Sequence, residues 1–388
     1  MTIKFYNSLT NQKEEFIPIR PGEVGMYVCG MTVYDNCHLG HARAMMAFDI
    51  LVRYLQYQDY KVNFIRNITD IDDKIIERAA ENQESIEDLT NRTISSMHED
   101  FARLDLELPA TEPRATDYIK GMIEMINQLI EKGHAYHSEG GDVFFAVRTF
   151  TEYGKLSNKN IDDLNPGSRI AEDESKKDPL DFVLWKSAKP NEPSWDSPWG
   201  PGRPGWHIEC SVMSFENLGQ HFDIHGGGPD LLFPHHENEI AQSECASGQK
   251  FANYWMHSGL LKINGEKMSK SLGNFAMLKD LFKSYHPEVI RYYLISSHYR
   301  SSLNFDNESL DQARAALTRL YQALALSSDG VKELHQESIE EFTNSMNDDL
   351  NTPEALSILF GLAKLVNSSA SEKEQGMYVS TMKELSQV

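Results

Sequence analysis

The feature that most constrains the fold is an apolar strand, a long helix and a second apolar strand near the start of the chain. Residues 25–30 have the composition of a short buried strand, and residues 38–58 then carry apolar side chains at helical spacing. A second strand is predicted at residues 61–65. Two neighbouring strands joined by a crossover helix run parallel. We therefore predict an α/β fold built on a doubly wound, Rossmann-type parallel sheet, with ligands bound at the carboxyl ends of its strands.

Changes of texture divide the rest of the chain into segments. A helix is predicted over 115–132, strands resume at 207–210 and 222–225, and the chain is helical and polar from about residue 307. We interpret the part between the strands as an insertion into the parallel-sheet domain. The predicted segments are residues 1–114 (first half of the Rossmann-type domain), 115–204 (connective insertion), 205–250 (second half), 251–306 (a region around a Lys- and Ser-rich loop) and 307–388 (C-terminal helical bundle).

The sequence predicts neither a signal peptide for export nor a membrane-spanning segment. Lys13, Glu14 and Glu15 interrupt the N-terminal segment before any signal-peptide core can form. The most apolar later stretch, residues 355–366, is too short to span a bilayer and contains Lys364. We therefore expect a cytoplasmic protein that does not bind membranes.

Charge and cysteine content narrow the classes of function further. The net charge of -21 excludes binding of nucleic acid by overall attraction, so any contact with RNA must depend on a local basic surface. The four cysteines are too few and too scattered for a disulfide framework in 388 residues. We expect them to be reduced thiols or metal ligands.

The string His38-Leu39-Gly40-His41 lies at the start of the first predicted helix, directly after a strand. Free backbone N–H groups and the helix dipole favour an anion at such a position. The two imidazoles add donors, and Gly40 allows a nucleotide to approach the backbone closely. Two histidines at a helix start are, on their own, more often caps or surface residues.

A second string, Lys267-Met268-Ser269-Lys270-Ser271, lies in a polar loop. Two lysines three residues apart can reach one polyphosphate, and the small serines permit a tight loop that can move. A solvated basic turn is the simpler interpretation. A given string of five residues arises by chance in a chain of this length with a probability of about one in ten thousand, so the signal is specific.

A candidate metal site follows the glycine-rich loop at 226–229. His235 and Glu239 are four residues apart after Pro234, so on a helix they share one face, a spacing that lets two side chains hold one metal ion. Such a pair is usually a surface pair. Cys29 and Cys210 favour the metal interpretation, because each is predicted to end a strand at the rim where a site should form.

The two strings together resemble the paired signatures of class I aminoacyl-tRNA synthetases, with Leu39 where that class commonly has isoleucine. The surrounding strings at 27–30, 67–70 and 206–210 resemble cysteinyl-tRNA synthetases specifically, and the resemblance extends from about Gly22 to at least Thr352. It implies activation of cysteine with ATP, with Mg²⁺ expected, to cysteinyl-adenylate and pyrophosphate. Cysteine then passes to the 3′ end of tRNA(Cys).

The resemblance also implies roles for individual residues. The residues matched to catalysis are His38, His41, Lys267 and Lys270, and those matched to ATP binding are His38, Gly40, His41 and Lys270. The family's zinc ligands correspond to Cys29, Cys210, His235 and Glu239, and this mixture of sulfur, nitrogen and oxygen donors suits one Zn²⁺ per chain.

Selectivity for cysteine follows from the chemistry that the family implies. A thiol has a pKa near roughly 8.5 and loses its proton on a metal, whereas a serine hydroxyl is far more basic and a poorer ligand of zinc. We therefore expect no editing site in the insertion. Further candidates for the amino-acid and adenylate pocket are Thr32, Asp70, Trp206 and His225, with Asp70 for the substrate ammonium and Trp206 beside the sulfur. A capping aspartate and a core tryptophan are the simpler alternatives for these last two residues.

Two alternatives remain open at this point. A zinc-dependent paralogue that passes activated cysteine to an amino sugar in mycothiol synthesis would share every motif, and a catalytically silent RNA-binding homologue would share the fold. Synthetases of this family continue into a small anticodon-binding domain, and this chain ends at Val388 in a helical segment, so we expect that domain to be absent or truncated. We expect a monomer.

Overall fold

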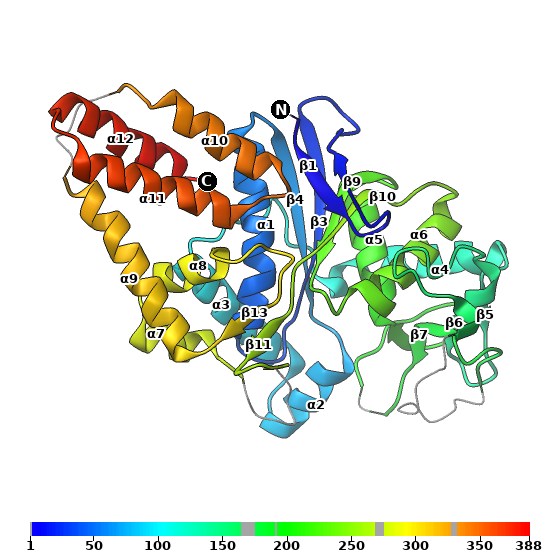
Figure 1. Ribbon diagram of the computed structural model, residues 1–388. Coiled ribbons are helices and arrows are strands. Elements are labelled where there is room, and N and C mark those ends of the chain that lie inside the picture. The colour runs from blue at the N-terminus through cyan, green and yellow to red at the C-terminus, as the bar shows by residue number, and fades with distance from the viewer. Residues whose placement is uncertain (1, 164–174, 191, 268–274, 327–331) are drawn as a thin grey trace.

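The computed structural model describes residues 2–163, 175–190, 192–267, 275–326 and 332–388 (Figure 1). Within these residues a parallel sheet lies at the centre, in the order β10-β9-β3-β4. Its strands are β3 (Glu23–Thr32), β4 (Lys61–Thr69), β9 (Phe222–Gly227) and β10 (Ala252–His257). The chain moves from β3 outward to β4 and later returns to form β9 on the other side of β3. The strand order therefore reverses between β3 and β9, where a doubly wound sheet binds its ligands.

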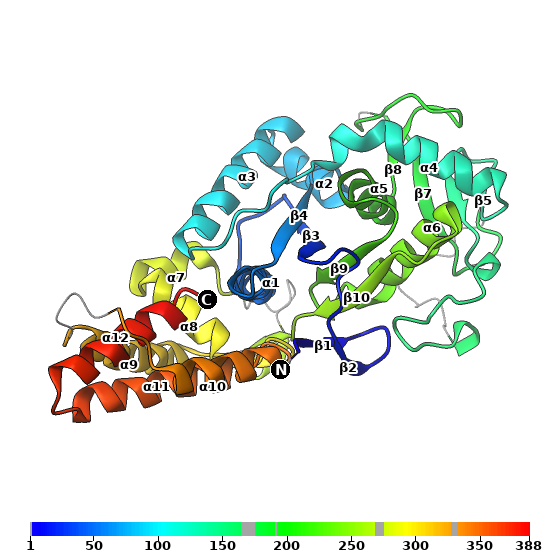
Figure 2. The ribbon, with the colours of Figure 1, turned by 90° about the horizontal axis from the view of Figure 1, so that it is seen from above.

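Helices cover both faces of this sheet, as the prediction of an α/β fold requires. Helix α1 (Leu39–Tyr57) packs on one face, and α5 (Trp206–Leu218) and α6 (Glu237–Ser247) pack on the other (Figure 2). Side chains of α1 such as Phe48 and Leu51 are completely or almost completely buried against the strands. Burial of each such side chain stabilises the fold by roughly 1.5–3 kcal/mol.

One predicted strand is wrong: residues 207–210 lie in the first turn of α5. A short apolar run does not distinguish a buried strand from a buried helix. The spacing decides the structure, because Ile208, Val212 and Phe215 recur at helical intervals, and the helix begins after Gly205 and ends at Gly219. Cys210 thus reaches the rim of the sheet from a helix and not from the end of a strand.

Residues between the two halves of the central sheet form a second, antiparallel sheet in the order β5-β6-β7-β8. Its strands are β5 (Ala135–His137), β6 (Val143–Phe145), β7 (Phe182–Ser187) and β8 (Gly202–Pro204), and α4 (Ile119–Glu131) precedes them. Trp185 of β7 is fully buried in the core that this sheet shares with α4, α5 and α6. The segment that the sequence predicts as an insertion therefore packs directly on the helices of the parallel sheet.

The remaining elements surround these two sheets. The first 103 residues also contain β1 (Lys4–Asn7), β2 (Gln12–Glu15), α2 (Asp73–Asn82) and α3 (Ile86–Arg103). A small sheet contains β11 (Leu261–Ile263), β12 (Glu266–Lys267) and β13 (Leu303–Phe305). Between β12 and β13 the chain forms α7 (Leu278–Ser284) and α8 (Pro287–Ile295). The chain then forms α9 (Asn307–Leu324), α10 (Gln336–Asn347), α11 (Thr352–Ser368) and α12 (Glu372–Leu385).

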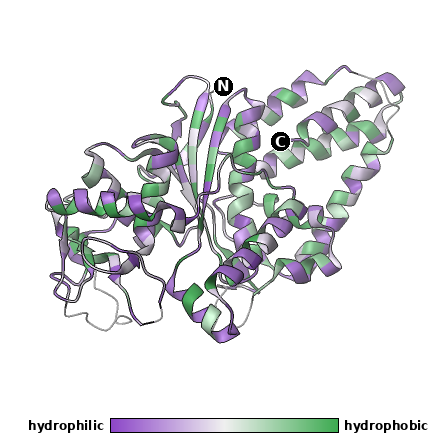
Figure 3. Cartoon of the chain, turned by 180° about the vertical axis from the view of Figure 1, so that it is seen from behind, coloured by the Kyte–Doolittle hydropathy of each residue, from purple (hydrophilic) through white to green (hydrophobic). Residues whose placement is uncertain are grey.

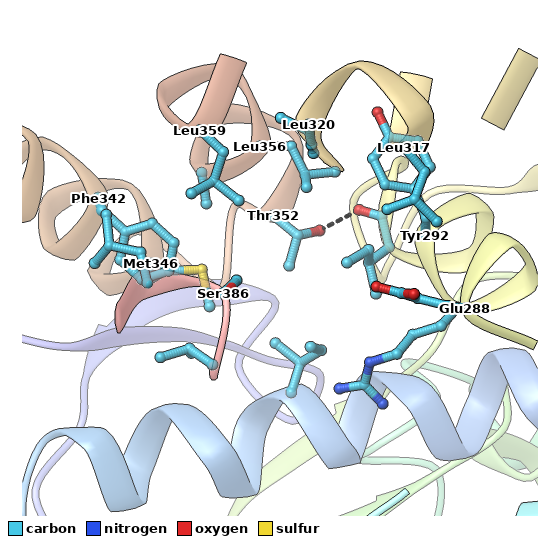
Figure 4. A pocket seen from close by; sticks show the side chains of 16 residues that line it. Glu288, Tyr292, Leu317, Leu320, Phe342, Met346, Thr352, Leu356, Leu359 and Ser386 are labelled. Carbon is cyan, nitrogen blue, oxygen red and sulfur yellow. Dashed lines mark hydrogen bonds between the residues drawn. The ribbon is translucent and has the colours of Figure 1, made fainter. Parts of the chain in front are cut away.

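The C-terminal helices form the predicted bundle, and their hydropathy alternates around each helix as expected for amphipathic helices (Figure 3). A cavity of about 150 Å³ lies where the bundle meets α1 and α8 (Figure 4). Its walls are mostly apolar, and the Thr352 hydroxyl among them donates a hydrogen bond to the carbonyl of Ile295 at 2.7 Å. None of the candidate site residues lines this cavity. Among the helices of the described ranges, none is long and apolar enough to cross a membrane.

Candidate active site and metal centre

A second cavity, of about 350 Å³, opens at the carboxyl ends of β3 and β9, where the strand order reverses. The candidate residues that line it come from four parts of the chain. They are Cys29 and Thr32 of β3, His38, Gly40 and His41 at the start of α1, and Trp206 at the start of α5. Gly228 and Asp230, from the loop after β9, form the fourth part of the wall. The candidate residues thus line a cavity at the edge of the sheet where the sequence predicts the site.

His38 and His41 cap the N-terminus of α1 reciprocally. Nδ1 of each ring accepts the backbone N–H of the other residue at 3.3 Å, and the rings stack with their centroids 3.6 Å apart. Burial lowers the pKa of His38 to about 4, and burial together with the charge of His38 lowers the pKa of His41 well below its usual range. Both rings are therefore neutral at pH 7, and because Nδ1 accepts, each ring carries its proton on Nε2. Each ring offers one neutral donor to a ligand.

The residues that follow the second signature lie next to the first signature. The Leu39 N–H donates to the carbonyl of Ala276, and the Leu278 N–H donates to the carbonyl of Cys37, at 2.8 and 3.0 Å. Phe275 lines the cavity and approaches the His38 ring with its centroid at 5.3 Å. Lys267 ends β12, whereas Lys270 lies outside the described residues. The backbone at residues 276–278, after the second string, is thus hydrogen-bonded to the chain at the start of α1.

Four buried side chains converge beside the cavity. Cys29 Sγ lies 3.6 Å from Cys210 Sγ, 3.6 Å from His235 Nε2 and 3.5 Å from Glu239 Oε1, and His235 Nε2 lies 3.0 Å from that carboxylate oxygen. Bonds of about 2.0–2.3 Å to a tetrahedral zinc place neighbouring donors roughly 3.3–3.8 Å apart. Two sulfurs, one nitrogen and one oxygen at these separations fit a zinc ion.

The charges in this cluster favour a cation. Burial raises the pKa of the Cys29 thiol. Burial also opposes ionisation of Cys210, but the hydrogen bond from Cys29 and the charge of His235 lower the pKa of Cys210 to about 6. Burial disfavours the charges of His235 and Glu239, yet attraction to Glu239 raises the pKa of His235 to about 10. Attraction to His225 and to His235 lowers the pKa of Glu239 well below its usual range. A divalent metal ion would displace the protons of His235 and Cys29 and offset two of the three negative charges then carried by Cys29, Cys210 and Glu239.

Local backbone features aim two of these ligands. Between Val28 and Met31 the register of β3 against β4 shifts at a bulge, and Cys29 lies within it. Gly30 makes the close approach possible, because a Cβ there would lie 1.8 Å from the carbonyl oxygen of Asn67. The second feature is a break in the helix at Phe233, where the backbone is non-helical. His235 lies in the short turn at Leu232–His236 that contains this break, and Glu239 lies in the first turn of α6.

Two further buried histidines, His225 and His236, lie next to the cluster on the Glu239 side. His225 Nε2 hydrogen-bonds to Glu239 Oε2 at 2.8 Å, and its ring stacks on Trp255 at 4.4 Å. Cys29 and Glu239 with His225 and His236 form a second set of donors close enough for one metal. The first set fits zinc better because it uses both thiols. His225 does not line the cavity, so its place is beneath Glu239 and not beside a substrate.

Two of the remaining candidates differ in their surroundings. The Trp206 side chain is 38% exposed, lines the cavity and packs on His235 at a centroid distance of 4.2 Å, so it is not a core tryptophan. Asp70 instead accepts hydrogen bonds from the Thr116 N–H at 3.0 Å and hydroxyl at 2.7 Å. Its carboxylate caps the short helix at residues 115–118, and it is not among the described residues that line the cavity.

The sequence analysis missed several residues of the cavity wall. Asp230 lies in this wall directly after the glycine-rich loop. Tyr34 and Lys74, from two other parts of the chain, also line the cavity. The loop position of Asp230 after strand β9 was a usable signal, because polar side chains at the ends of parallel strands face ligands. Lys74 gave no such signal, since a lysine in the first turn of a helix is usually a solvated side chain.

Comparison with known proteins identifies the family. A family model described as "tRNA synthetases class I (C) catalytic domain" matches residues 15–315, and a "DALR domain" model matches residues 341–388. A cysteine-tRNA ligase of Methylococcus capsulatus is 58% identical over 100% of this chain and 84% of its own length. The chain belongs to the cysteine-tRNA ligase family.

Further members of this family are equally similar to the chain. Cysteine-tRNA ligases of Legionella pneumophila and Shewanella woodyi are 59% and 57% identical over 95% and 94% of the chain, and the chain covers 81% and 80% of their lengths. The chain is thus a ligase of the class I aminoacyl-tRNA synthetases, as predicted. The paralogue and the silent homologue are not favoured.

Solved structures of other synthetases share the fold. Methionyl-tRNA synthetase of Mycobacterium tuberculosis, in complex with methionyl-adenylate, superposes with a TM-score of 0.68 at 15% identity over 94% of this chain and 88% of its own. A leucyl-tRNA synthetase of Agrobacterium radiobacter gives 0.70 at 11% identity over 95% and 84%. These likenesses confirm the predicted fold class.

Proposed function

We propose that this cysteine-tRNA ligase activates cysteine at the cavity between β3 and β9 and selects it through a zinc ion held by Cys29, Cys210, His235 and Glu239. The observation that carries the proposal is the convergence of those four buried donors at separations that suit tetrahedral zinc. One of them, Cys29, lies in the wall of the same cavity that His38 and His41 line. When bound, zinc would supply a Lewis-acid site that binds a thiolate more strongly than a hydroxyl.

The residues of the chain divide the remaining work. The carboxylate of cysteine attacks the α-phosphorus of ATP, and the bond to pyrophosphate breaks, so the protein supplies donors and cations and no nucleophile of its own. His38 and His41 donate from Nε2 at the start of α1, where the helix dipole also favours phosphate. Lys267 and Lys270 supply the positive charge, with Mg²⁺ as the counter-ion of ATP. The carboxylate of Asp230 faces the cavity and is suited to the substrate ammonium.

Metal analysis combined with pyrophosphate exchange tests the proposal. The purified protein should contain one zinc per chain and catalyse cysteine-dependent exchange of pyrophosphate into ATP, and it should charge tRNA(Cys) but not an amino sugar. Cys210→Ser should lose the metal and the preference for cysteine over serine. A folded Cys210→Ser protein that keeps both would overturn the assignment of the zinc site.

Lys270→Ala separates the phosphate machinery from the metal. Loss of a cation that meets the developing charge should slow adenylate formation by about two orders of magnitude. Zinc content should be unchanged, because the four proposed ligands come from other stretches of chain. Equal loss of zinc and of exchange would contradict the roles assigned here.

A further inference from the structure

We propose that Lys74 is a further substrate-binding residue, which contacts a backbone phosphate of the tRNA acceptor end as it enters the cavity. The inference rests on the proposed function, because it assumes that the cavity between β3 and β9 receives tRNA. Lys74 lies in the first turn of α2, which follows the carboxyl end of β4 at the lower edge of the sheet in Figure 1.

Lys74 is the only lysine or arginine among the described residues that line the cavity. The other basic side chains of the wall are His38 and His41, which are buried and neutral at pH 7. The whole chain carries a net charge of -21, so a polyanion meets general repulsion and gains from a local cation at the mouth. Among the described residues of the cavity wall, Lys74 is therefore the cation that an incoming polynucleotide would meet.

Ion pairs on two sides fix the first turn of α2. Asp73 accepts from Lys186 of β7 at 2.5 Å and from Arg203 of β8, which ties the helix to the insertion. Further along α2, Arg78 pairs with Asp35, in the loop before α1, at 3.2 Å. The turn that carries Lys74 is therefore held between the insertion and the start of the first signature.

The Lys74 side chain itself is exposed and uncommitted to a carboxylate. Its Nζ lies 5.7 Å from the centroid of the Tyr34 ring, and no ion pair is formed with an acidic group of the described chain. The start of α1 already provides an ATP-phosphate site, and the thiol cluster provides the amino-acid site. The tRNA end is the remaining anionic substrate, and its phosphates stay near solvent, where Lys74 is.

The test compares Lys74→Ala with Lys61→Ala. Lys61 begins β4 at the opposite, amino-terminal edge of the sheet and its side chain is 84% exposed, so its removal changes the net charge equally without touching the cavity. For Lys74→Ala, kcat/KM for tRNA(Cys) should fall about tenfold, the loss expected for one charge-assisted hydrogen bond. The slope of log kcat/KM against log salt should fall by about one.

The size of the loss in each reaction identifies the ligand. The loss in aminoacylation should exceed the loss in pyrophosphate exchange at least fivefold, and Lys74→Arg should restore most of it. A parallel rise of KM for ATP in exchange would overturn the proposal and assign Lys74 to the nucleotide. Values equal to those of Lys61→Ala would overturn it as well. Wild-type protein without any exchange would instead refute the proposed function.

Discussion

At the scale of single residues, hydrogen bonds to the backbone decide what the stacked histidines can offer. His38 and His41 each use Nδ1 to accept an N–H at the helix start, which leaves Nε2–H as the donor. The motif could be predicted from the sequence, because two histidines three residues apart before an apolar helix suit both a cap and an anion site. The stacking and the neutral state of the rings depend on burial by distant residues, which spacing along the chain does not reveal.

The neutral state of His38 predicts a pH dependence of stability. Its pKa is about 4 in the folded protein and about 6.5 in a model peptide, so the unfolded state binds the proton first as the pH falls. The contribution to stability is present above about pH 6.5 and is lost toward pH 4. We expect His38→Asn, which keeps a capping side chain, to reduce the pH dependence of the free energy of unfolding in this window by up to one proton. Urea denaturation at pH 7 and pH 5 measures this, and identical pH dependence in both proteins would contradict the prediction.

Trp206 makes a separate prediction about the substrate. Its indole packs on the ring of His235 and faces the cavity, where it would cover the thiol side of a bound amino acid. We expect Trp206→Ala to raise KM for cysteine in pyrophosphate exchange about tenfold, since apolar surface that the indole would cover contributes roughly 25 cal/mol per Å². Trp206→Phe should recover most of the affinity, and zinc content should be normal in both variants. Zinc loss in Trp206→Ala would mean that the ring only supports the metal ligand.

At the scale of elements, the sequence locates the parallel sheet well and the approach of Cys210 poorly. Strand β3 is a largely apolar run bounded by turns, which is typical of a buried parallel strand. Strand β4 mixes apolar and polar residues, and it is found from its place after the crossover helix. Residues 207–210 alternate polar and apolar side chains, as a strand would, but belong to α5, and only the spacing over the whole of that helix shows it. The bulge at Cys29 could not be predicted either, because it depends on where Asn67 lies in the neighbouring strand.

That bulge gives a prediction for one glycine of β3. A methyl group at residue 30 would lie 1.8 Å from the Asn67 carbonyl oxygen, so Gly30→Ala must separate β3 from β4 beside the proposed ligand Cys29. We expect loss of stability by about 3 kcal/mol or more together with loss of metal, measured by denaturation and by zinc analysis. Gly25→Ala in the same strand is the matched control, since its added methyl would meet other atoms at ordinary contact distances of 3.6 Å or more. Equal stability of the two variants would contradict this account of the bulge.

At the scale of the whole molecule, the bundle and the parallel-sheet domain are connected by contacts far apart in the sequence. Helical periodicity predicts the bundle, but no local pattern indicates which residues join it to the rest. The connection centres on the turn between α10 and α11, where Asp349 is completely buried. Its carboxylate accepts from the Tyr6 N–H at 2.8 Å, the Tyr299 hydroxyl at 2.8 Å and Arg300 Nε at 2.7 Å.

Asp349 therefore joins the first strand, the segment after α8 and the bundle through one side chain. Asp349→Ala would leave the Tyr6 N–H and the buried Tyr299 hydroxyl without their acceptor, and each unsatisfied buried polar group costs about 1–3 kcal/mol. The neighbouring Asp348→Ala is the matched control, because that side chain is 56% exposed and only pairs with Lys13 on the surface, which contributes about 0–1 kcal/mol. Chemical denaturation followed by Trp fluorescence should show a large loss for residue 349 and little for residue 348. None of these contacts reaches the proposed zinc ligands, so Asp349→Ala protein that remains folded at low temperature should still bind zinc and exchange pyrophosphate. Its aminoacylation of tRNA should fall, because the bundle is no longer held in place against the parallel sheet. Exchange and aminoacylation falling together would show that Asp349 supports the cavity itself and not the attachment of the bundle.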